Sequence, residues 1–146
     1  MDGNKISVGN SGEYFVAAEL ERRGYTCAVP MSNTKDFDIL AIRRDNNHQY
    51  AIQVKTTSKG IKHWQLNAKN EQLIGDNIIY VFVVLNGLAT PEYHIVPSAV
   101  VADYIYSNHR KWLATPGRNG QKHKDTPMRT FEDKSDEYLD KWELLK

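Results

Sequence analysis

Two short stretches of the chain carry side chains that suit metal and phosphate chemistry. Asp36 and Asp38 lie close together in the first, and Gln53 and Lys55 lie close together in the second. We expect both stretches to be strands, joined by a polar turn over residues 43–48. Because side chains alternate between the two faces of a strand, a hairpin would bring a carboxylate, an amide oxygen and an ammonium to one face. Oxygen ligands hold hard cations such as Mg²⁺, and a neighbouring lysine can orient water or stabilise charge on a phosphate. Exposed strands also carry such residues without any chemistry.

A third acidic residue lies upstream, on a segment with helical periodicity. Glu13, Val16 and Leu20 fall at positions i, i+3 and i+7, so they share one face of a helix that we expect to end at Gly24. A carboxylate at the start of an apolar stripe needs a partner, because an unpaired buried charge is costly. Two interpretations stay open. With Asn10 as the N-cap, Glu13 is the third helical residue and completes a capping box, or it belongs to the same site as the strand residues.

The order and spacing of these residues resemble the PD-(D/E)XK nuclease superfamily. Within it, the chain is most similar to the archaeal Holliday-junction resolvases and the Mrr-type restriction nucleases. The resemblance covers roughly residues 9–57, and it rests on the runs Gly12–Leu20, Arg23–Tyr25, Phe37–Ala41 and Ile52–Thr56. It implies a restriction-endonuclease-like α/β fold, with a central mixed β-sheet flanked by helices, in a single domain over residues 1–146.

The resemblance also implies roles for individual residues. Asp38 is the principal metal ligand, Gln53 is the second side-chain ligand, and the carbonyl of Val54 adds another. Glu13 contributes a ligand directly or through water, and Lys55 orients the attacking water or stabilises the transition state. The implied cofactor is Mg²⁺, with Mn²⁺ as a substitute. The implied reaction is metal-dependent hydrolysis of DNA phosphodiesters by an endonuclease, which we expect to act as a homodimer with one site per strand.

The chain departs from the family pattern at two positions. Phe37 stands where the motif has proline, and Gln53 stands where it has an acidic residue. An amide brings no charge, so the site should hold a cation less tightly. Two readings follow. Glu13 restores the missing charge and the enzyme is active, or the fold persists as a weakened or inactive module that binds DNA or a protein partner.

Two basic segments suit a polyanionic partner. The segment 56–69 follows the motif lysine directly, and the segment 109–129 has six basic residues against one acid. Because 109–129 is also rich in Gly, Pro and Asn, we expect a mobile loop there. The residues that we expect to contact nucleic acid are Lys59, Lys62, Lys69, Arg118, Lys122 and Lys124.

The remaining pattern completes an α/β domain. The run 78–85 is almost entirely β-branched and aromatic, which is typical of a strand buried on both faces. Pro97 is suited to open a helix. The other elements that we expect are strands over 25–29 and 93–96 and a C-terminal helix over 135–145, capped by Ser135.

Composition excludes several classes of protein. The 146 residues contain one cysteine, Cys27, so no internal disulfide can form. The longest apolar run is too short to span a bilayer, and the start of the chain has no apolar signal segment, so we expect a cytoplasmic protein without membrane contact. The five histidines lack zinc-site spacing, and no Gly-rich phosphate loop predicts a nucleotide cofactor.

Overall fold

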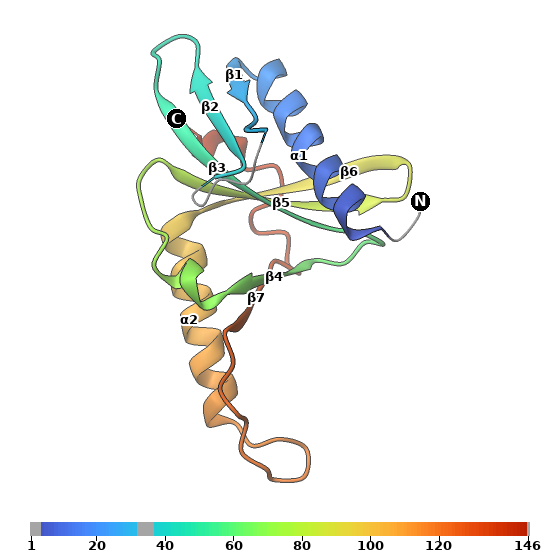
Figure 1. Ribbon diagram of the computed structural model, residues 1–146, viewed down its shortest axis with the longest axis vertical. Coiled ribbons are helices and arrows are strands. Elements are labelled where there is room, and N and C mark those ends of the chain that lie inside the picture. The colour runs from blue at the N-terminus through green and yellow to red at the C-terminus, as the bar shows by residue number, and fades with distance from the viewer. Residues whose placement is uncertain (1–3, 32–36, 146) are drawn as a thin grey trace.

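A five-stranded mixed sheet forms the centre of the molecule, and a two-stranded sheet lies beside it (Figure 1). The computed structural model describes residues 4–31 and 37–145. The strand order is β1-β2-β3-β5-β6 in the larger sheet and β4-β7 in the smaller one. The elements are α1 (Lys5–Arg22), β1 (Tyr25–Ala28), β2 (Ile39–Arg43), β3 (Gln49–Thr57), β4 (His63–Asn67), η1 (Ala68–Glu71), β5 (Ile78–Asn86), β6 (Ala89–Pro97), α2 (Ser98–Ala114), β7 (Met128–Glu132) and η2 (Trp142–Leu144).

The register of β3 decides which side chains meet. β2 and β3 form the predicted antiparallel hairpin, with Ile39 opposite Ile52. β3 runs parallel to β5, which places Gln53 beside Tyr80 and Lys55 beside Phe82. β5 and β6 then form a second antiparallel hairpin. The sheet is therefore mixed, as predicted.

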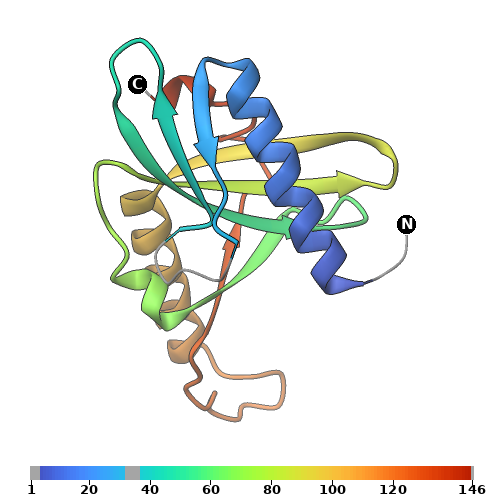
Figure 2. The ribbon, with the colours of Figure 1, turned by 45° about the horizontal axis from the view of Figure 1, so that its top comes forward.

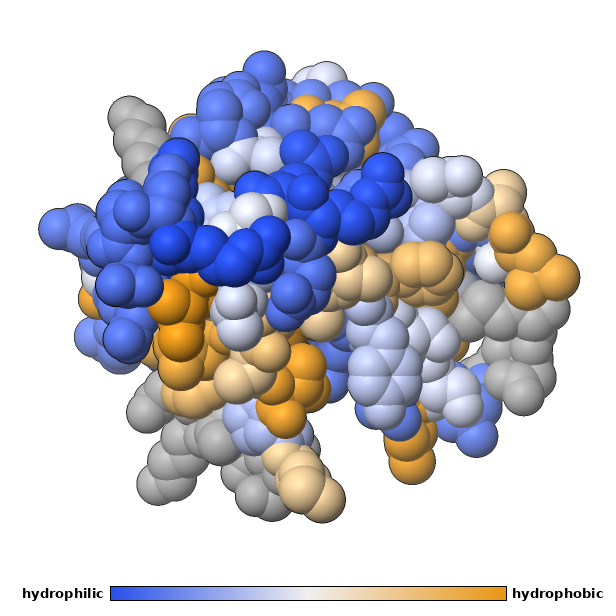
Figure 3. All heavy atoms as spheres, turned by 90° about the horizontal axis from the view of Figure 1, so that it is seen from above, coloured by the Kyte–Doolittle hydropathy of each residue, from blue (hydrophilic) through white to orange (hydrophobic). Residues whose placement is uncertain are grey.

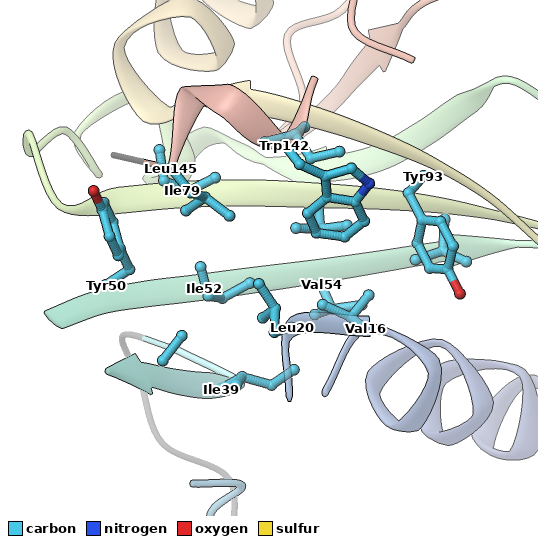
Figure 4. Packing of buried hydrophobic residues seen from close by; sticks show 14 of the residues in the cluster. Val16, Leu20, Ile39, Tyr50, Ile52, Val54, Ile79, Tyr93, Trp142 and Leu145 are labelled. Carbon is cyan, nitrogen blue, oxygen red and sulfur yellow. The ribbon is translucent and has the colours of Figure 1, made fainter. Parts of the chain in front are cut away.

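The two faces of the sheet carry separate hydrophobic clusters. α1 crosses one face, where Val16 and Leu20 pack against Ile52 and Val54 (Figures 2 and 4). α2 and the small sheet cover the other face, where the cluster comprises Trp64, Leu66, Tyr80, Phe82, Val84, Val96, Val101, Ile105 and Phe131. Alternate residues of β5 enter each cluster, which confirms that this strand is buried on both sides.

α1 begins at Lys5, six residues before the start that an N-cap at Asn10 would give. The side chain of Asn4 accepts hydrogen bonds from the N–H groups of Ile6 and Ser7, so Asn4 is the N-cap. Asn10 lies inside the helix and Glu13 lies near its middle. The capping-box interpretation of Glu13 is therefore wrong.

The segment 109–129 is not one loop. α2 continues to Ala114 and β7 begins at Met128, so residues 115–127 alone connect them. This connection projects away from both sheets (Figure 1). The Trp112 ring of α2 stacks on His123 at 4.0 Å, and His109 Nε2 lies 2.8 Å from an Asp125 carboxylate oxygen. These contacts fasten the connection to the helix.

The predicted C-terminal helix over 135–145 is also wrong, because one 3-10 turn, η2, stands in its place. Asp136 and Asp140 have positive φ angles of 58° and 54°, which interrupt a right-handed helix. Asp133, rather than Ser135, accepts the N–H groups of residues 137 and 138, in the turns that precede η2. Trp142 of this segment still packs against the sheet, in the same hydrophobic cluster as Val16 and Leu20 of α1 (Figure 4).

The strand predicted over 93–96 is longer, since β6 starts at Ala89. Within the described residues, no helix is long and apolar enough to cross a membrane.

Candidate metal and phosphate site

Asp38 is held against the middle of β3 by its backbone and its side chain. It lies directly before β2, and its N–H donates to the carbonyl of Ile52 at 2.9 Å. Its Oδ2 accepts the N–H of Val54 at 2.8 Å. Because Val54 lies between Gln53 and Lys55, this hydrogen bond fixes the Asp38 carboxylate beside both predicted partners.

Gln53 and Lys55 lie on the same face of β3, as the alternation predicts. Gln53 is buried next to Tyr80, whose hydroxyl accepts a hydrogen bond from Asn70 Nδ2 at 2.8 Å. Burial raises the pKa of Tyr80, the hydrogen bond from Asn70 lowers it, and the negative charge of Asp38 raises it further. Ile39 lies opposite Ile52 in antiparallel register, so Asp38 lies opposite Gln53, and directly opposed residues share a face of the sheet.

Lys55 opens onto a cavity. It is partly buried and lines a space of about 480 Å³ between β3 and the small sheet. The cavity wall also contains Thr57, His63, Gln65 and Thr130. A lysine at the edge of a solvent-connected cavity is placed to meet a phosphate entering from that side.

Glu13 reaches the same region from α1. Burial raises the pKa of Glu13, the nearby Asp38 carboxylate raises it further, and the Lys55 ammonium lowers it. Gly12, the residue before Glu13, lies against Thr56, the residue after Lys55, so α1 carries Glu13 to the part of β3 that bears Lys55. With the cap excluded, a role for Glu13 in the site stays a prediction.

Gly12 makes that approach possible. A Cβ added at Gly12 would lie 1.8 Å from Thr56 Oγ1 and 2.9 Å from Thr56 Cβ. α1 therefore touches β3 at a point where only hydrogen fits, one residue from both Glu13 and Lys55. The sequence alone did not predict that Gly12 contacts β3. The signal that could have indicated it is a glycine inside a helical pattern, which often marks close packing.

The donor set at this place fits a hard divalent cation. Asp38 and Glu13 offer carboxylate oxygens, and Gln53 offers an amide oxygen, which are ligands that Mg²⁺ accepts. The repulsion between the two carboxylates is what a bound cation would offset. Val54, whose carbonyl is a predicted ligand, borders the site through its backbone. Asp36, the weaker candidate, lies outside the described residues.

Of the six residues predicted to contact nucleic acid, Lys62 is paired with acids and the other five are exposed. Lys62 pairs with Asp136 at 2.7 Å and with Glu92 at 3.7 Å, so its charge is already matched by acids. The other five have exposed side chains, namely Lys59, Lys69, Arg118, Lys122 and Lys124.

The end of the molecule that carries the β2–β3 turn is also rich in charged residues, but there the positive charges are paired with acids. Figure 3 shows hydrophilic side chains gathered over the end that carries the β2–β3 turn. Its arginines pair with neighbouring acids, as Arg43 does with Asp45 and Arg44 with Glu21. Such paired charges leave little excess positive potential for a phosphate.

Sequence comparison finds no matching family model and no matching curated protein. Comparison of structures finds the bacterial homing endonuclease I-Ssp6803I, with a TM-score of 0.59 and 11% identity, covering 99% of this chain and 92% of that one. It also finds the Holliday junction resolvase Hjc of Archaeoglobus fulgidus, with a TM-score of 0.50 and 14% identity, covering 89% of this chain and 86% of that one. The chain therefore has the restriction-endonuclease-like fold, as its resemblance to the PD-(D/E)XK nucleases predicts.

Proposed function

We propose that this protein is a Mg²⁺-dependent DNA endonuclease whose site consists of Asp38, Gln53, Lys55 and Glu13. The observation that carries the proposal is the hydrogen bond from the Val54 N–H to Asp38 Oδ2, because it joins the carboxylate to the strand of the amide and the lysine. The fold supports the same conclusion, since both similar structures are nucleases, one a homing endonuclease and one a Holliday junction resolvase.

Each residue then has a physical task. Asp38 and Glu13 would hold the ion through carboxylate oxygens, and Gln53 and the Val54 carbonyl would add neutral ligands. Bound Mg²⁺ supplies Lewis acidity and lowers the pKa of its bound water. Lys55 orients the attacking water and stabilises the negative charge that grows on the non-bridging phosphate oxygens.

DNA binding rests on exposed cations outside the site. Lys59 and Lys69 lie on the β4 side, and Arg118, Lys122 and Lys124 lie on the projecting connection after α2. Their contacts with phosphates position the duplex without reading its sequence. We propose that two copies act together, so that each strand of the duplex meets one site.

The test is cleavage of plasmid, linear, single-stranded and four-way-junction DNA, each with Mg²⁺, Mn²⁺ or EDTA. Asp38→Ala is the site variant, and Asp45→Ala is the matched control because Asp45 is an exposed aspartate in the β2–β3 turn. Metal-dependent cutting that Asp38→Ala loses and Asp45→Ala keeps supports the proposal. Salt-sensitive binding without cutting of any substrate would identify a DNA-binding module instead, and loss of both activities would reject a role on DNA.

A further inference from the structure

A second group of potential ligands lies on β6 and the turn after β7. Glu92 and His94 belong to β6, and Asp136 belongs to the turn. One ligand atom from each lies within 4.8 Å of the other two. His94 is separated from Lys55 by Phe82, its cross-strand neighbour on β5, so this group is distinct from the proposed nuclease site.

A buried carboxylate fixes the orientation of His94. The ring is fully buried, and its Nδ1 lies 2.6 Å from Asp133 Oδ2. Asp133 is itself buried, and it accepts the N–H groups of Glu137 and Tyr138, both at 3.0 Å. Because a carboxylate oxygen accepts hydrogen bonds, we assign an imidazole proton to Nδ1, which donates to Asp133 Oδ2.

The other ring nitrogen faces a carboxylate without a hydrogen bond. His94 Nε2 lies 3.6 Å from Glu92 Oε2, and neither buried atom has a hydrogen-bond partner within residues 4–31 and 37–145. A lone pair facing a carboxylate oxygen away from water is unfavourable. A carboxylate that orients a histidine, whose second nitrogen faces further oxygens, is the arrangement found around metal-bound histidines.

Distance and charge both suit a divalent cation. Two ligands of a tetrahedral Zn²⁺ lie about 3.4 Å apart when its bonds are about 2.1 Å long, close to the Nε2–Oε2 separation. Three carboxylates, those of Glu92, Asp133 and Asp136, lie around His94, and one ammonium, that of Lys62, lies 2.7 Å from Asp136 and 3.7 Å from Glu92. The carboxylates outnumber the ammonium by two, a difference that one divalent ion would balance.

An ion can reach this place from solvent. The side chains of Lys62, Glu92 and Asp136 are 27%, 34% and 37% exposed. Lys62 pairs with Glu92 and Asp136 through its terminal ammonium, and its flexible stem lets that ammonium swing outward. Lys62 and the metal ion would compete for the same carboxylate oxygens.

We propose that Glu92, His94 and Asp136 bind one Zn²⁺-class transition-metal ion, with Asp133 as the residue that orients His94. The ion fastens the segment after β7 to β6. That segment already meets β6 through the N–H of Ile95, which donates to Tyr138, and the N–H of Asp140, which donates to Tyr93. Its end buries Trp142 in the core, so the ion stabilises the whole fold.

Titration of metal-free protein with Zn²⁺, and with Co²⁺ as a visible-light probe, tests the proposal. The Asp38→Ala variant is the starting protein, so that binding does not depend on the proposed nuclease site. We expect one equivalent of metal, a Co²⁺ absorption band, and a melting temperature raised by roughly 5 °C at one hundred times the dissociation constant.

Glu92→Gln and Asp136→Asn should each weaken binding at least tenfold, and Glu137→Gln, a neighbouring exposed carboxylate, should not. Lys62→Met should tighten binding.

Two results would overturn the site. One is the absence of stoichiometric binding in both the starting protein and its Lys62→Met derivative, which would make the Lys62 ammonium the permanent cation of the cluster. The other is binding that Glu92→Gln and Asp136→Asn leave unchanged. Neither result bears on DNA cleavage, which is measured separately on protein with Asp38 intact.

Discussion

At the scale of single residues, the neutral Gln53 is the feature that most affects the proposed metal site. It occupies a buried position beside Tyr80, on the strand that binds the Asp38 carboxylate. An amide can donate an oxygen to a cation but adds no charge. In the proposed site, Asp38 and Glu13 would therefore balance most of the positive charge of a bound ion.

The Gln53→Glu variant tests this balance. Without metal, the added buried carboxylate should lower the melting temperature by several degrees, because it faces Asp38 unpaired. With Mn²⁺, the variant should recover that loss and bind the ion roughly tenfold more tightly than the native chain. Thermal melts with and without Mn²⁺ measure both effects.

Gln49→Glu on the same strand is the control, since residue 49 is exposed at the start of β3. Its melting temperature and its response to Mn²⁺ should match those of the native chain. Weaker Mn²⁺ binding by Gln53→Glu would contradict the site.

Cys27 provides a prediction at the same scale that is independent of catalysis. Burial raises the pKa of this thiol to about 11, with a further increase from Glu21 and a decrease from Arg44. The thiolate is the reactive form, so alkylation by iodoacetamide at pH 8 should be about one hundredfold slower than for a free cysteine. Its rate should rise about tenfold for each pH unit up to the pKa. Rapid alkylation at pH 8 would show that the thiol is more accessible than in this structure.

At the scale of elements, the contact between α1 and β3 determines whether Glu13 reaches the strand residues. Gly12 lies against Thr56 with no room for a Cβ, whereas nothing lies within 4 Å of a Cβ at Gly9, one helical turn earlier. The two glycines thus form a matched pair within one helix.

Gly12→Ala should destabilise the fold by about 1–3 kcal/mol, because the helix must move away from β3. It should also reduce DNA cleavage more than DNA binding, since Glu13 moves with the helix. Gly9→Ala should stabilise the fold by about 0.5–1 kcal/mol and leave cleavage unchanged. Urea denaturation and cleavage assays on both variants measure these effects, and equal behaviour of the two would refute the role given to Gly12.

The elements also show what the sequence predicts and where it fails. The β2–β3 hairpin and β5 are predictable because alternation and apolar runs are local signals. The start of α1 is not, because Gly9 and Gly12 disfavour a helix, although Asn4 caps one that runs through both. The β4–β7 sheet joins strands about sixty residues apart, so no local pattern reveals it. The final segment has an apolar side suited to a helix, but its backbone forms turns instead. Asp133 accepts the N–H of Glu137, and Asp136 and Asp140 adopt the left-handed backbone conformation.

At the scale of the whole molecule, charge is separated between two ends. The end over the β2–β3 turn has paired arginines, while the projecting connection after α2 carries the exposed Arg118, Lys122 and Lys124. The stack of Trp112 on His123 holds this connection against the helix. We therefore expect the projection to hold DNA by its phosphates, away from the site of cutting.

Reversing the charges at Arg118, Lys122 and Lys124 together should weaken DNA binding at least tenfold. The slope of log affinity against log salt should become shallower by up to about 3, because each lost phosphate contact removes about one released counterion. The cleavage rate at saturating enzyme should stay unchanged. Lys141→Glu, an exposed lysine near the C-terminal turn, is the control. An unchanged salt dependence in the triple variant would show that DNA lies elsewhere.

The most direct test of the central claim separates binding from cutting at Lys55. Substrate that the native protein cleaves with Mg²⁺ is mixed with Lys55→Met, a variant of similar side-chain length, and both affinity and single-turnover rate are measured. The proposed site predicts near-native DNA affinity and a cleavage rate at least one hundredfold lower, because the group that stabilises charge in the transition state is gone. Cleavage at the native rate by Lys55→Met would contradict the site and move the chemistry elsewhere in the fold.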